Sequence, residues 1–273
     1  MDSITVRAYA KLNLTLGVLY RRADGYHALD TIMQSVDLYD AVTVTRASDV
    51  SVTAVGMQLP YENTLKKAAD LYRAVSGKGA SIRVVKSIPA EAGMGGGSAD
   101  AAAVLYALDR LYGETGHAQL LDMALSVGAD VPFCLHGGVA RCEGIGEIIT
   151  PLSGFPLHFV VAKPKEGVST KALFSRLTLP RSRPDTAGAI AALAGGDVEK
   201  LGGCLCNALQ QPAVELVPEI GTLLTQLKNA GAVGVSMTGS GSAVFGLFRD
   251  EQTALSAKNA VDAAAFSAYC KSV

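Results

Sequence analysis

The sequence has no excess of positive charge and no cluster of basic residues. Lys and Arg total 24 against 25 Asp and Glu, which gives a formal net charge of -1. Proteins that bind nucleic acid or anionic membranes do so through concentrated Lys and Arg side chains. We therefore expect neither nucleic acid nor a membrane as a partner, and a near-neutral surface fits a monomer or a weak homodimer equally well.

Long hydrophobic runs are also missing. No apolar stretch reaches the roughly 18 residues that a membrane-spanning helix needs, and the first residues, MDSIT, lack the basic and apolar regions of a secretory signal. Cysteine is scarce and odd in number, the five residues being Cys134, Cys142, Cys204, Cys206 and Cys270. A chain of this length does not depend on disulfides, so we expect reduced thiols in a cytoplasmic protein.

Apolar residues, in contrast, are numerous enough for a large core. Of 273 residues, 49% are hydrophobic, which fits one large or two modest domains. The clearest change of composition is the Pro- and Gly-containing stretch at residues 151–156. We place a domain boundary there and expect an N-terminal domain at residues 1–155 and a C-terminal domain at residues 156–273.

Hydrophobic periodicity predicts the secondary structure. Alternation over residues 4–55 predicts a run of strands with a turn at Asp24-Gly25, and residues 82–85 predict another strand. Helical spacing covers residues 63–75, 99–111 and 120–127. The second half mixes predicted helices and strands, which favours a two-layer α/β sandwich. Its predicted helices are residues 169–176, 186–193, 218–229 and 251–264, and its predicted strands are residues 157–162, 233–237 and 243–248.

Glycine is enriched, and its densest cluster is Gly93-Met94-Gly95-Gly96-Gly97-Ser98. The cluster lies between a predicted strand and an Ala-rich predicted helix. Adjacent glycines let backbone N–H groups converge on an anion, and a helix N-terminus adds partial positive charge, so the segment favours a phosphate site. The alternatives are a flexible linker or a tight turn, with Ser98 serving only as a helix N-cap. The segment matches neither the P-loop pattern nor the dinucleotide-binding pattern.

Six motifs together carry a resemblance to a known family. Three of them are AKLNL at residues 10–14, PAEAGMGGGSA at 89–99 and MTGSGSA at 237–243. The others are RADGYH at 22–27, GADVPF at 128–133 and KEGVST at 165–170. From about residue 8 to 248, the sequence resembles the galactokinase, homoserine kinase, mevalonate kinase and phosphomevalonate kinase (GHMP kinase) superfamily. Within it, the sequence is similar to the branch that phosphorylates 4-diphosphocytidyl-2-C-methyl-D-erythritol.

The resemblance implies both a fold and an activity. The fold is a two-domain α+β GHMP kinase fold, with an N-terminal domain like the second domain of ribosomal protein S5 and a C-terminal ferredoxin-like α/β sandwich. The activity is that of a small-molecule kinase of the non-mevalonate isoprenoid pathway. It would use ATP and Mg²⁺ to phosphorylate the 2-hydroxyl of the cytidine-diphosphate substrate, giving the 2-phosphate and ADP.

Asp130 and Lys11 are the candidate catalytic residues. Asp130 stands among apolar neighbours, where partial desolvation favours proton acceptance, and the resemblance makes it the base for the attacking hydroxyl. Lys11 is the only charged residue between Ala8 and Tyr20, and the resemblance assigns its ammonium to the developing charge. Without the resemblance, Asp130 reads equally as a helix-end cap or as a buried Asp with its hydrogen bonds satisfied. Lys11 then reads as an exposed residue at a strand end.

The resemblance also assigns binding residues. Tyr26 and Phe174 would sandwich the cytosine while His27 reads its edge, although Phe174 at this spacing is otherwise typical of a core residue. For the rest of the substrate the candidates are Asn13, Thr170, Thr238, Gly239 and Ser240, of which 238–241 also read as a strand-linking turn. For ATP the candidates are Gly93, Met94, Gly95, Gly96, Gly97 and Ser98 around the phosphates, with Asn63 and Lys86 near adenine. Asn63 and Lys86 read equally as a helix cap and a surface charge.

The magnesium ligands differ from those of other family members. Several members carry Ser-Ser where this sequence has Gly96-Gly97, and that hydroxyl helps to bind the metal. Here the hydroxyl comes one residue later, so Ser98 is a candidate ligand and the full ligand set stays open. The dispersed histidines and the pair Cys204 and Cys206 do not make a zinc pattern.

Two other functions fit parts of the sequence. A homoserine or mevalonate kinase has the same superfamily motifs, but its substrate has no base for Tyr26 and His27 to bind. A catalytically silent nucleotide sensor on the same scaffold needs neither Lys11 nor Asp130.

Overall fold

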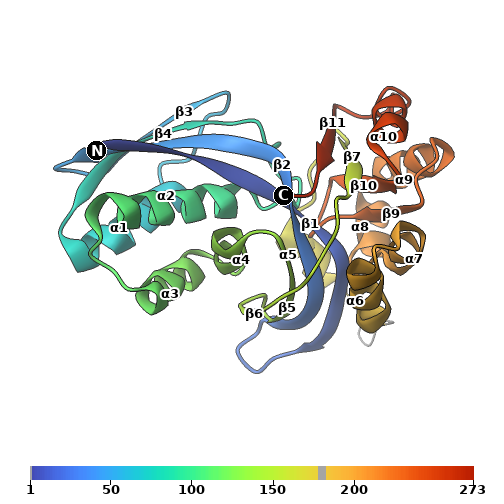
Figure 1. Cartoon of the computed structure of the whole chain (residues 1–273), viewed down its shortest axis with the longest axis horizontal. Coiled ribbons are helices and arrows are strands. Elements are labelled where there is room, and N and C mark those ends of the chain that lie inside the picture. Colours follow the sequence, from blue (N-terminus) through green and yellow to red (C-terminus); the bar gives the residue numbers. More distant parts are fainter. Residues whose placement is uncertain (1, 178–182) are drawn as a thin grey trace. The chain divides into compact units, whose positions relative to one another are not determined.

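A computed structural model describes residues 2–177 and 183–273 of the chain (Figure 1). The chain forms two compact units. Unit 1 consists of Met1–Ala10, Leu38–Ile88 and Gly95–Gly137, and unit 2 consists of Lys11–Asp37, Pro89–Met94 and Gly138–Val273. Neither unit is continuous in sequence, because the chain passes from one to the other several times.

Two long strands explain this division. Strand β1 (Ser3–Arg21) and strand β2 (His27–Ala47) are 19 and 21 residues long and are joined by a short turn. Alternation over residues 4–55 predicted a run of strands, and the structure resolves it into this hairpin followed by β3 (Ser51–Val55). Each long strand contributes residues to both units, so the units are not consecutive segments of the chain. The boundary at 155 stays a prediction.

Unit 1 covers one sheet with helices. Strand β3 pairs parallel with β4 (Gly79–Val85), which pairs antiparallel with residues 41–47 of β2. The helices are α1 (Thr64–Ser76), α2 (Gly96–Tyr112), α3 (His117–Val127) and α4 (Val131–His136). The core joins sheet and helix residues, among them Val42, Ile82, Leu65, Tyr72 and Leu105. The Ala-rich face of α2 is buried there because small side chains allow close packing.

Unit 2 has a four-stranded antiparallel sheet with the order β11-β7-β10-β9. The strands are β7 (His158–Lys163), β9 (Gly234–Met237), β10 (Val244–Phe248) and β11 (Phe266–Lys271). Helices α9 (Glu219–Asn229) and α10 (Glu251–Lys258) pack on it, and the shared core includes Val160, Leu223, Leu227 and Phe248. This arrangement confirms the α/β sandwich expected for the second half.

The remaining elements of unit 2 are short. Strand β5 (Val139–Gly144) pairs with residues 29–34 of β2 and with β6 (Ile148–Pro151), and β8 (Cys206–Asn207) lies parallel beside β1. The short helices are α5 (Thr170–Ser175), α6 (Thr186–Gly195), α7 (Val198–Cys204) and α8 (Gln210–Leu216).

Two differences from the predicted elements have local causes. The predicted helix at 251–264 ends at Lys258, since the chain turns at Asn259. Four strands (β5, β6, β8 and β11) and three helices (α4, α7 and α8) were not predicted, and all are seven residues or fewer, too short to show a period.

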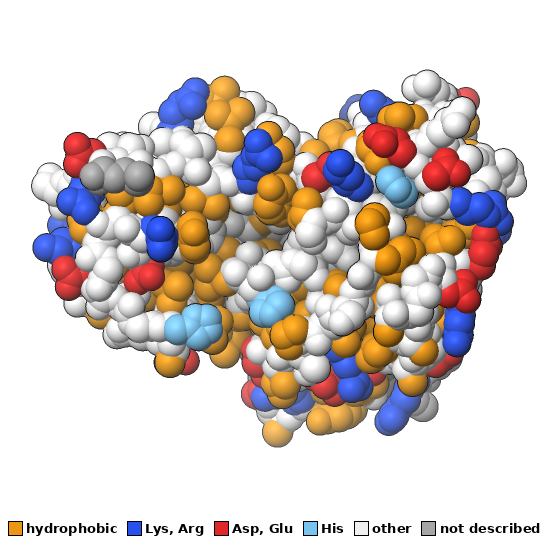
Figure 2. Space-filling view, viewed as in Figure 1, with side chains coloured by type: hydrophobic (Ala, Val, Ile, Leu, Met, Phe, Trp, Pro, Cys, Tyr) orange, Lys and Arg blue, Asp and Glu red, His pale blue; other side chains and the backbone are white. Residues whose placement is uncertain are grey.

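No helix in the described part of the chain has the length and apolarity to cross a membrane. On the face seen in Figure 2, basic and acidic side chains are interspersed, without a continuous basic stripe.

Candidate functional site

Lys11 is a buried cation near the middle of β1. Its side chain is held by Asn13, two residues further along the same face, whose Oδ1 lies 2.6 Å from Lys11 Nζ. The Lys11 backbone N–H donates to the carbonyl of Met94 in the glycine-rich segment at 3.0 Å. Lys11 is only 3% exposed, so its interpretation as an exposed residue at a strand end is wrong.

Asn13 is the centre of a buried hydrogen-bond network. Its Oδ1 accepts from Lys11 Nζ and from the backbone N–H of Gly239 at 2.9 Å, and its Nδ2 donates to Thr31 Oγ1 at 2.9 Å. Its backbone N–H donates to Thr238 Oγ1 at 3.1 Å. Direct contact of Asn13 with substrate stays a prediction, since the structure shows the amide occupied by protein partners and only 1% exposed.

Backbone hydrogen bonds join the motif MTGSGSA (residues 237–243) to the two residues that precede the glycine-rich segment, Gly93 to Ser98. Ser242 and Ala243 donate their N–H groups to the carbonyls of Glu91 and Ala92 at 3.1 and 3.3 Å. A Cβ on Gly93 would lie 2.1 Å from the Thr238 carbonyl oxygen, and Gly93 has a φ of +69°. Gly93 is therefore required for this close approach, as well as being a candidate for phosphate binding.

Ser240, in the motif at residues 237–243, contacts Thr170 at the start of α5. Gly241 N–H donates to the Thr238 carbonyl, which closes the expected turn between β9 and β10. At the tip of this turn, Ser240 Oγ and Thr170 Oγ1 lie 2.8 Å apart. Both hydroxyls were predicted to bind substrate, and the structure brings them together.

The aromatic residues lie at the hairpin turn and on α5. Asp24 stabilises the turn by accepting a hydrogen bond from the Tyr26 backbone N–H at 3.1 Å. Tyr26 itself is 61% exposed. His27 stacks on Phe174, with ring centroids 4.8 Å apart and 25° between the planes. Burial and nearby Arg21 lower the pKa of His27, so its ring is neutral at neutral pH. A base that stacks on this face of Phe174 must replace the His27 ring.

Helix α2 begins within the glycine-rich segment. Gly95, at φ +71°, is its N-cap and provides no side-chain cap, so the alternative that Ser98 is the N-cap is wrong. The Thr64 hydroxyl donates to the Gly97 carbonyl at 2.7 Å and ties the first turn of α2 to the start of α1. The N-cap residue thus offers no side-chain acceptor to the first N–H groups of α2, which suits an anion site.

Lys86 lies in a buried cluster with two carboxylates. Its Nζ hydrogen-bonds to Asp40 Oδ2 and lies 2.7 Å from Asp100 Oδ2, and its side chain is 6% exposed, so the surface-charge alternative is wrong. Asp40 Oδ1 accepts from the backbone N–H groups of Ser87 and Ile88. Contact between Lys86 and adenine stays a prediction.

The electrostatics of this cluster favour one extra proton. Burial raises the pKa of Asp100 to about 7, against the lowering effect of Lys86. Burial acts to lower the pKa of Lys86, but Asp100 and Asp40 outweigh it and raise that pKa. Within the described part of the chain, Asp100 Oδ1 is buried and has no hydrogen-bond partner. Two carboxylates around one ammonium leave a net negative charge, which protonation of Asp100 removes.

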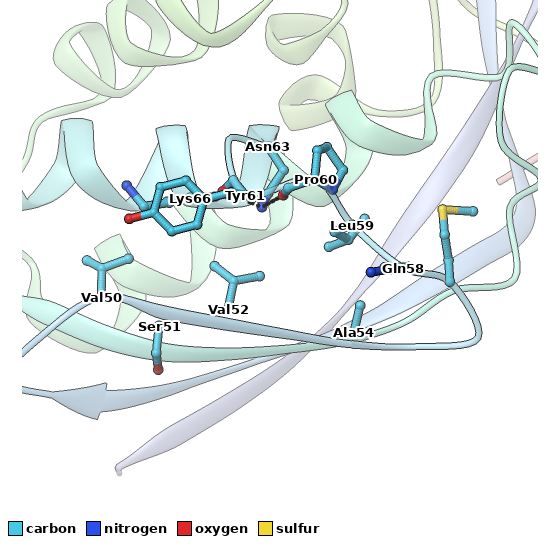
Figure 3. A pocket seen from close by; sticks show the side chains of 11 residues that line it. Val50, Ser51, Val52, Ala54, Gln58, Leu59, Pro60, Tyr61, Asn63 and Lys66 are labelled. Atoms are coloured by element: carbon cyan, nitrogen blue, oxygen red, sulfur yellow. Dashed lines mark hydrogen bonds between the residues drawn. The ribbon is translucent and has the colours of Figure 1, made fainter.

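Asn63 caps α1 and borders a pocket of about 400 Å³ (Figure 3). Its Oδ1 accepts from the Lys66 backbone N–H at 3.0 Å, which confirms the helix-cap interpretation. The pocket is bounded by β3 on one side and by the loop before α1 on the other. Its lining combines polar residues (Ser51, Gln58, Asn63 and Lys66) with apolar ones that include Val50, Val52, Ala54, Leu59, Pro60 and Tyr61.

Asp130 immediately precedes α4 and is half-buried. Its backbone carbonyl accepts from Cys134, but its side chain does not cap the helix. The helix-cap alternative is therefore wrong for the side chain, and its role as base stays a prediction. Over residues 2–177 and 183–273, no group of three His, Cys, Asp or Glu side chains could hold a metal ion.

Sequence reasoning did not identify Asp40, Asp100 or Thr31. Asp100 had a usable signal, because it is the only charged residue between Gly96 and Leu108 in an apolar helix. Asp40 and Thr31 carried none, since single polar residues in a strand pattern are common.

Comparison with known proteins agrees with these motifs. The GHMP kinases N terminal domain model matches residues 63–138, and the GHMP kinases C terminal model matches residues 189–268. The 4-diphosphocytidyl-2-C-methyl-D-erythritol kinase of Caldicellulosiruptor saccharolyticus is 42% identical over 262 residues, covering 92% of this chain and 90% of that protein.

Solved structures give the same result. A crystal structure of 4-(cytidine 5'-diphospho)-2C-methyl-D-erythritol kinase has a TM-score of 0.86 and 35% identity, covering 98% of this chain and 99% of that one. A homoserine kinase from Cytophaga hutchinsonii has a TM-score of 0.79 at 23% identity, covering 100% and 95% of the two chains, and this shows the fold alone. The chain belongs to the GHMP kinases and, within them, to the 4-diphosphocytidyl-2-C-methyl-D-erythritol kinase family.

Proposed function

We propose that this protein transfers the γ-phosphoryl group of ATP to the 2-hydroxyl of 4-diphosphocytidyl-2-C-methyl-D-erythritol, a step of isoprenoid precursor synthesis by the non-mevalonate route. The observation that carries the proposal is the buried Lys11 ammonium, held by Asn13 on a strand that hydrogen-bonds to Met94, in a chain of this family. A buried, oriented cation is what developing charge in a phosphoryl transfer needs.

In the proposed reaction, the substrate hydroxyl oxygen forms a bond to the γ-phosphorus of ATP. The bond between that phosphorus and the oxygen bridging to the β-phosphate breaks, and ADP leaves. The hydroxyl proton passes to the Asp130 carboxylate. Lys11 stabilises negative charge on the reacting oxygens. The half-buried position of Asp130 supports a carboxylate that exchanges protons with a substrate.

For ATP, we assign the phosphates to the glycine-rich segment and the base to the pocket beside Asn63. The uncapped start of α2 supports the phosphate assignment. The pocket volume lies within the range of small-molecule sites, and its apolar lining residues suit an aromatic base. Thr64, the residue after Asn63, hydrogen-bonds to Gly97, so the pocket and the first turn of α2 are neighbours in unit 1.

The residues present fit a magnesium ion carried by ATP. Magnesium keeps several waters and phosphate oxygens and needs only one or two protein ligands. Ser98 would supply one, because its half-buried hydroxyl makes no hydrogen bond to another residue in the described part of the chain. When bound, the ion neutralises charge on the β- and γ-phosphates.

On the substrate side, we assign cytosine to Tyr26, His27 and Phe174. The neutral His27 ring can both donate and accept a hydrogen bond at the edge of the base. The hydroxyls of Thr170, Ser240 and Thr238, with the backbone of Gly239, would line the rest of the substrate. The direct contact between Thr170 and Ser240 supports their acting together.

A substrate panel tests the proposal. The protein is incubated with ATP and Mg²⁺ and separately with 4-diphosphocytidyl-2-C-methyl-D-erythritol, homoserine and mevalonate, and ADP release is measured. We expect release only with the first compound. Release with homoserine or mevalonate would assign another activity, and no release with any compound would favour a silent nucleotide sensor.

A further inference from the structure

The buried amide of Asn13 has to present its oxygen, and not its nitrogen, to Lys11. An amide group is symmetric in shape, so packing alone does not distinguish the two orientations. Lys11 Nζ and the Gly239 N–H both donate to the oxygen, at 2.6 and 2.9 Å. In the reversed orientation, the amide NH₂ would face these two donors in place of the oxygen that accepts from them.

Thr31, on β2, specifies the orientation from the opposite side. Its hydroxyl donates to the Thr15 carbonyl at 2.5 Å, and a carbonyl oxygen can only accept. The single hydroxyl proton is therefore committed to Thr15. The Thr31 oxygen is left as an acceptor, and it takes the Asn13 Nδ2 proton at 2.9 Å. A reversed Asn13 would place its oxygen against this acceptor, without a proton between them.

Thr31 has no access to solvent and so acts only through its neighbours. It is 0% exposed, and Asn13 and Lys11 are 1% and 3% exposed. The chain of bonds from the Thr15 carbonyl through Thr31 and Asn13 ends at the Lys11 ammonium, and all four residues belong to unit 2. An unpaired group in such a buried chain is costly, which makes the orientation strongly preferred.

We propose that Thr31 is a positioning residue for phosphoryl transfer: it fixes the Asn13 amide so that its oxygen holds the Lys11 ammonium. The inference rests on the proposed function, because it assumes that Lys11 acts in the reaction. It gives Thr31, which the motifs did not single out, a role in turnover rather than in substrate binding.

The test compares Thr31→Val with Thr31→Ser in the full-length protein. Val has nearly the shape of Thr but no hydroxyl, and Ser keeps the hydroxyl. We expect Thr31→Val to lower kcat by roughly tenfold while KM for ATP and for the cytidyl substrate stays within about threefold, the size expected for one lost buried hydrogen bond. Thr31→Ser should restore kcat to within about twofold of the wild type.

Thr186→Val is the matched control for stability. Thr186 is buried in the same unit, and its hydroxyl donates to the Asp30 carboxylate at 2.9 Å and not to a member of the hydrogen-bonded chain from Thr15 to Lys11. Its loss should lower the unfolding midpoint and leave kcat unchanged. If Thr31→Val lowers only the unfolding midpoint, as the control does, the positioning role is rejected.

Two further variants separate the possible failures. Lys11→Met should abolish most turnover. Normal kcat in Lys11→Met would remove Lys11 from the mechanism and the role of Thr31 with it, whereas lost turnover in Lys11→Met beside normal kcat in Thr31→Val would reject the role of Thr31 alone. Thr31→Ala replaces Thr31→Val if the latter does not fold, with the same expected kcat. If neither folds, Thr31 acts through the fold and the positioning role is also rejected.

Discussion

Lys86 Nζ and Asp100 Oδ2 lie 2.7 Å apart in the interior of unit 1, and a second carboxylate, Asp40, binds the same ammonium. Asp100 belongs to the second turn of α2, and Lys86 follows β4 directly. The contact therefore joins the helix that starts at the glycine-rich segment to the end of a core strand. The two carboxylates and one ammonium of this cluster leave a net negative charge. The stability of the folded protein therefore depends on pH through Asp100.

The first prediction concerns the pH dependence of stability. The pKa of Asp100 is raised from 3.8 to about 7 in the folded protein, so the folded state holds a proton that the unfolded state releases. The stabilisation from this proton is complete below about pH 4 and is lost as the pH rises through 7. The free energy of unfolding, measured by urea denaturation between pH 5.5 and 8, should contain this downward contribution.

Asp100→Asn isolates the contribution, since Asn imitates the protonated carboxyl at every pH. The variant should match the wild type only below about pH 4, become more stable than it as the pH rises from about 4 to 7, and keep a constant advantage above pH 7. Parallel pH profiles for the two proteins would show that Asp100 does not titrate in this range.

The second prediction distinguishes two glycines of the same segment. In Gly93→Ala, the new Cβ would lie 2.1 Å from the Thr238 carbonyl oxygen in a left-handed backbone conformation, so we expect a large drop in the unfolding midpoint. In Gly97→Ala, the nearest atom is the Thr64 hydroxyl at 3.2 Å, and the residue is helical. Its stability should be unchanged or slightly raised, while KM for ATP increases because a methyl group enters the phosphate site. Unchanged KM in Gly97→Ala would contradict the phosphate assignment.

The third prediction concerns the pocket beside Asn63. Ala54 lines it, whereas Val55, the next residue of β3, points to the opposite face and is 45% exposed. Ala54→Leu should fill part of the pocket and raise KM for ATP severalfold, with little change in kcat. Val55→Leu is the control and should leave both constants unchanged. Equal effects of the two substitutions would exclude the pocket as the adenine site.

How far the sequence predicted this site depends on the kind of signal. Lys11, Asn13 and the glycine-rich segment lie in contiguous motifs, and the structure joins them through backbone and side-chain hydrogen bonds. The cluster of Asp40, Lys86 and Asp100 comes from three distant segments, and a sequence shows no such convergence before the fold is known.

For the secondary structure too, local patterns were predictable and contacts between distant segments were not. Long periodic helices such as α1 were predicted almost to the residue, because an amphipathic pattern is visible over several turns. The stacking of His27 on Phe174 and the left-handed backbone of Glu91, at φ 50°, were not. Both depend on contacts between segments that are distant in the sequence.

The fourth prediction tests the cytidyl site. His27→Ala should cost the full substrate roughly 1–3 kcal/mol in kcat/KM, since polar groups on the base lose a partner. The same variant should barely change the rate with 2-C-methyl-D-erythritol 4-phosphate, which carries the reacting hydroxyl but no cytidine. Equal losses with both compounds would mean that His27 acts elsewhere.

The fifth prediction concerns the base. Asp130→Asn is nearly isosteric and should bind both substrates normally, while kcat falls by roughly 10²–10⁴. Isothermal titration measures substrate binding, and steady-state kinetics measures kcat. A kcat within about threefold of the wild type would remove Asp130 from the mechanism.

Phosphoryl transfer to the 2-hydroxyl gives a product whose structure identifies the reaction. The protein is incubated with ATP, Mg²⁺ and 4-diphosphocytidyl-2-C-methyl-D-erythritol, and the products are analysed by phosphorus and carbon NMR. We expect one new phosphomonoester, attached to the tertiary 2-carbon, in amounts equal to the ADP formed. A phosphate on another hydroxyl, or ADP formed without any phosphomonoester, would contradict it.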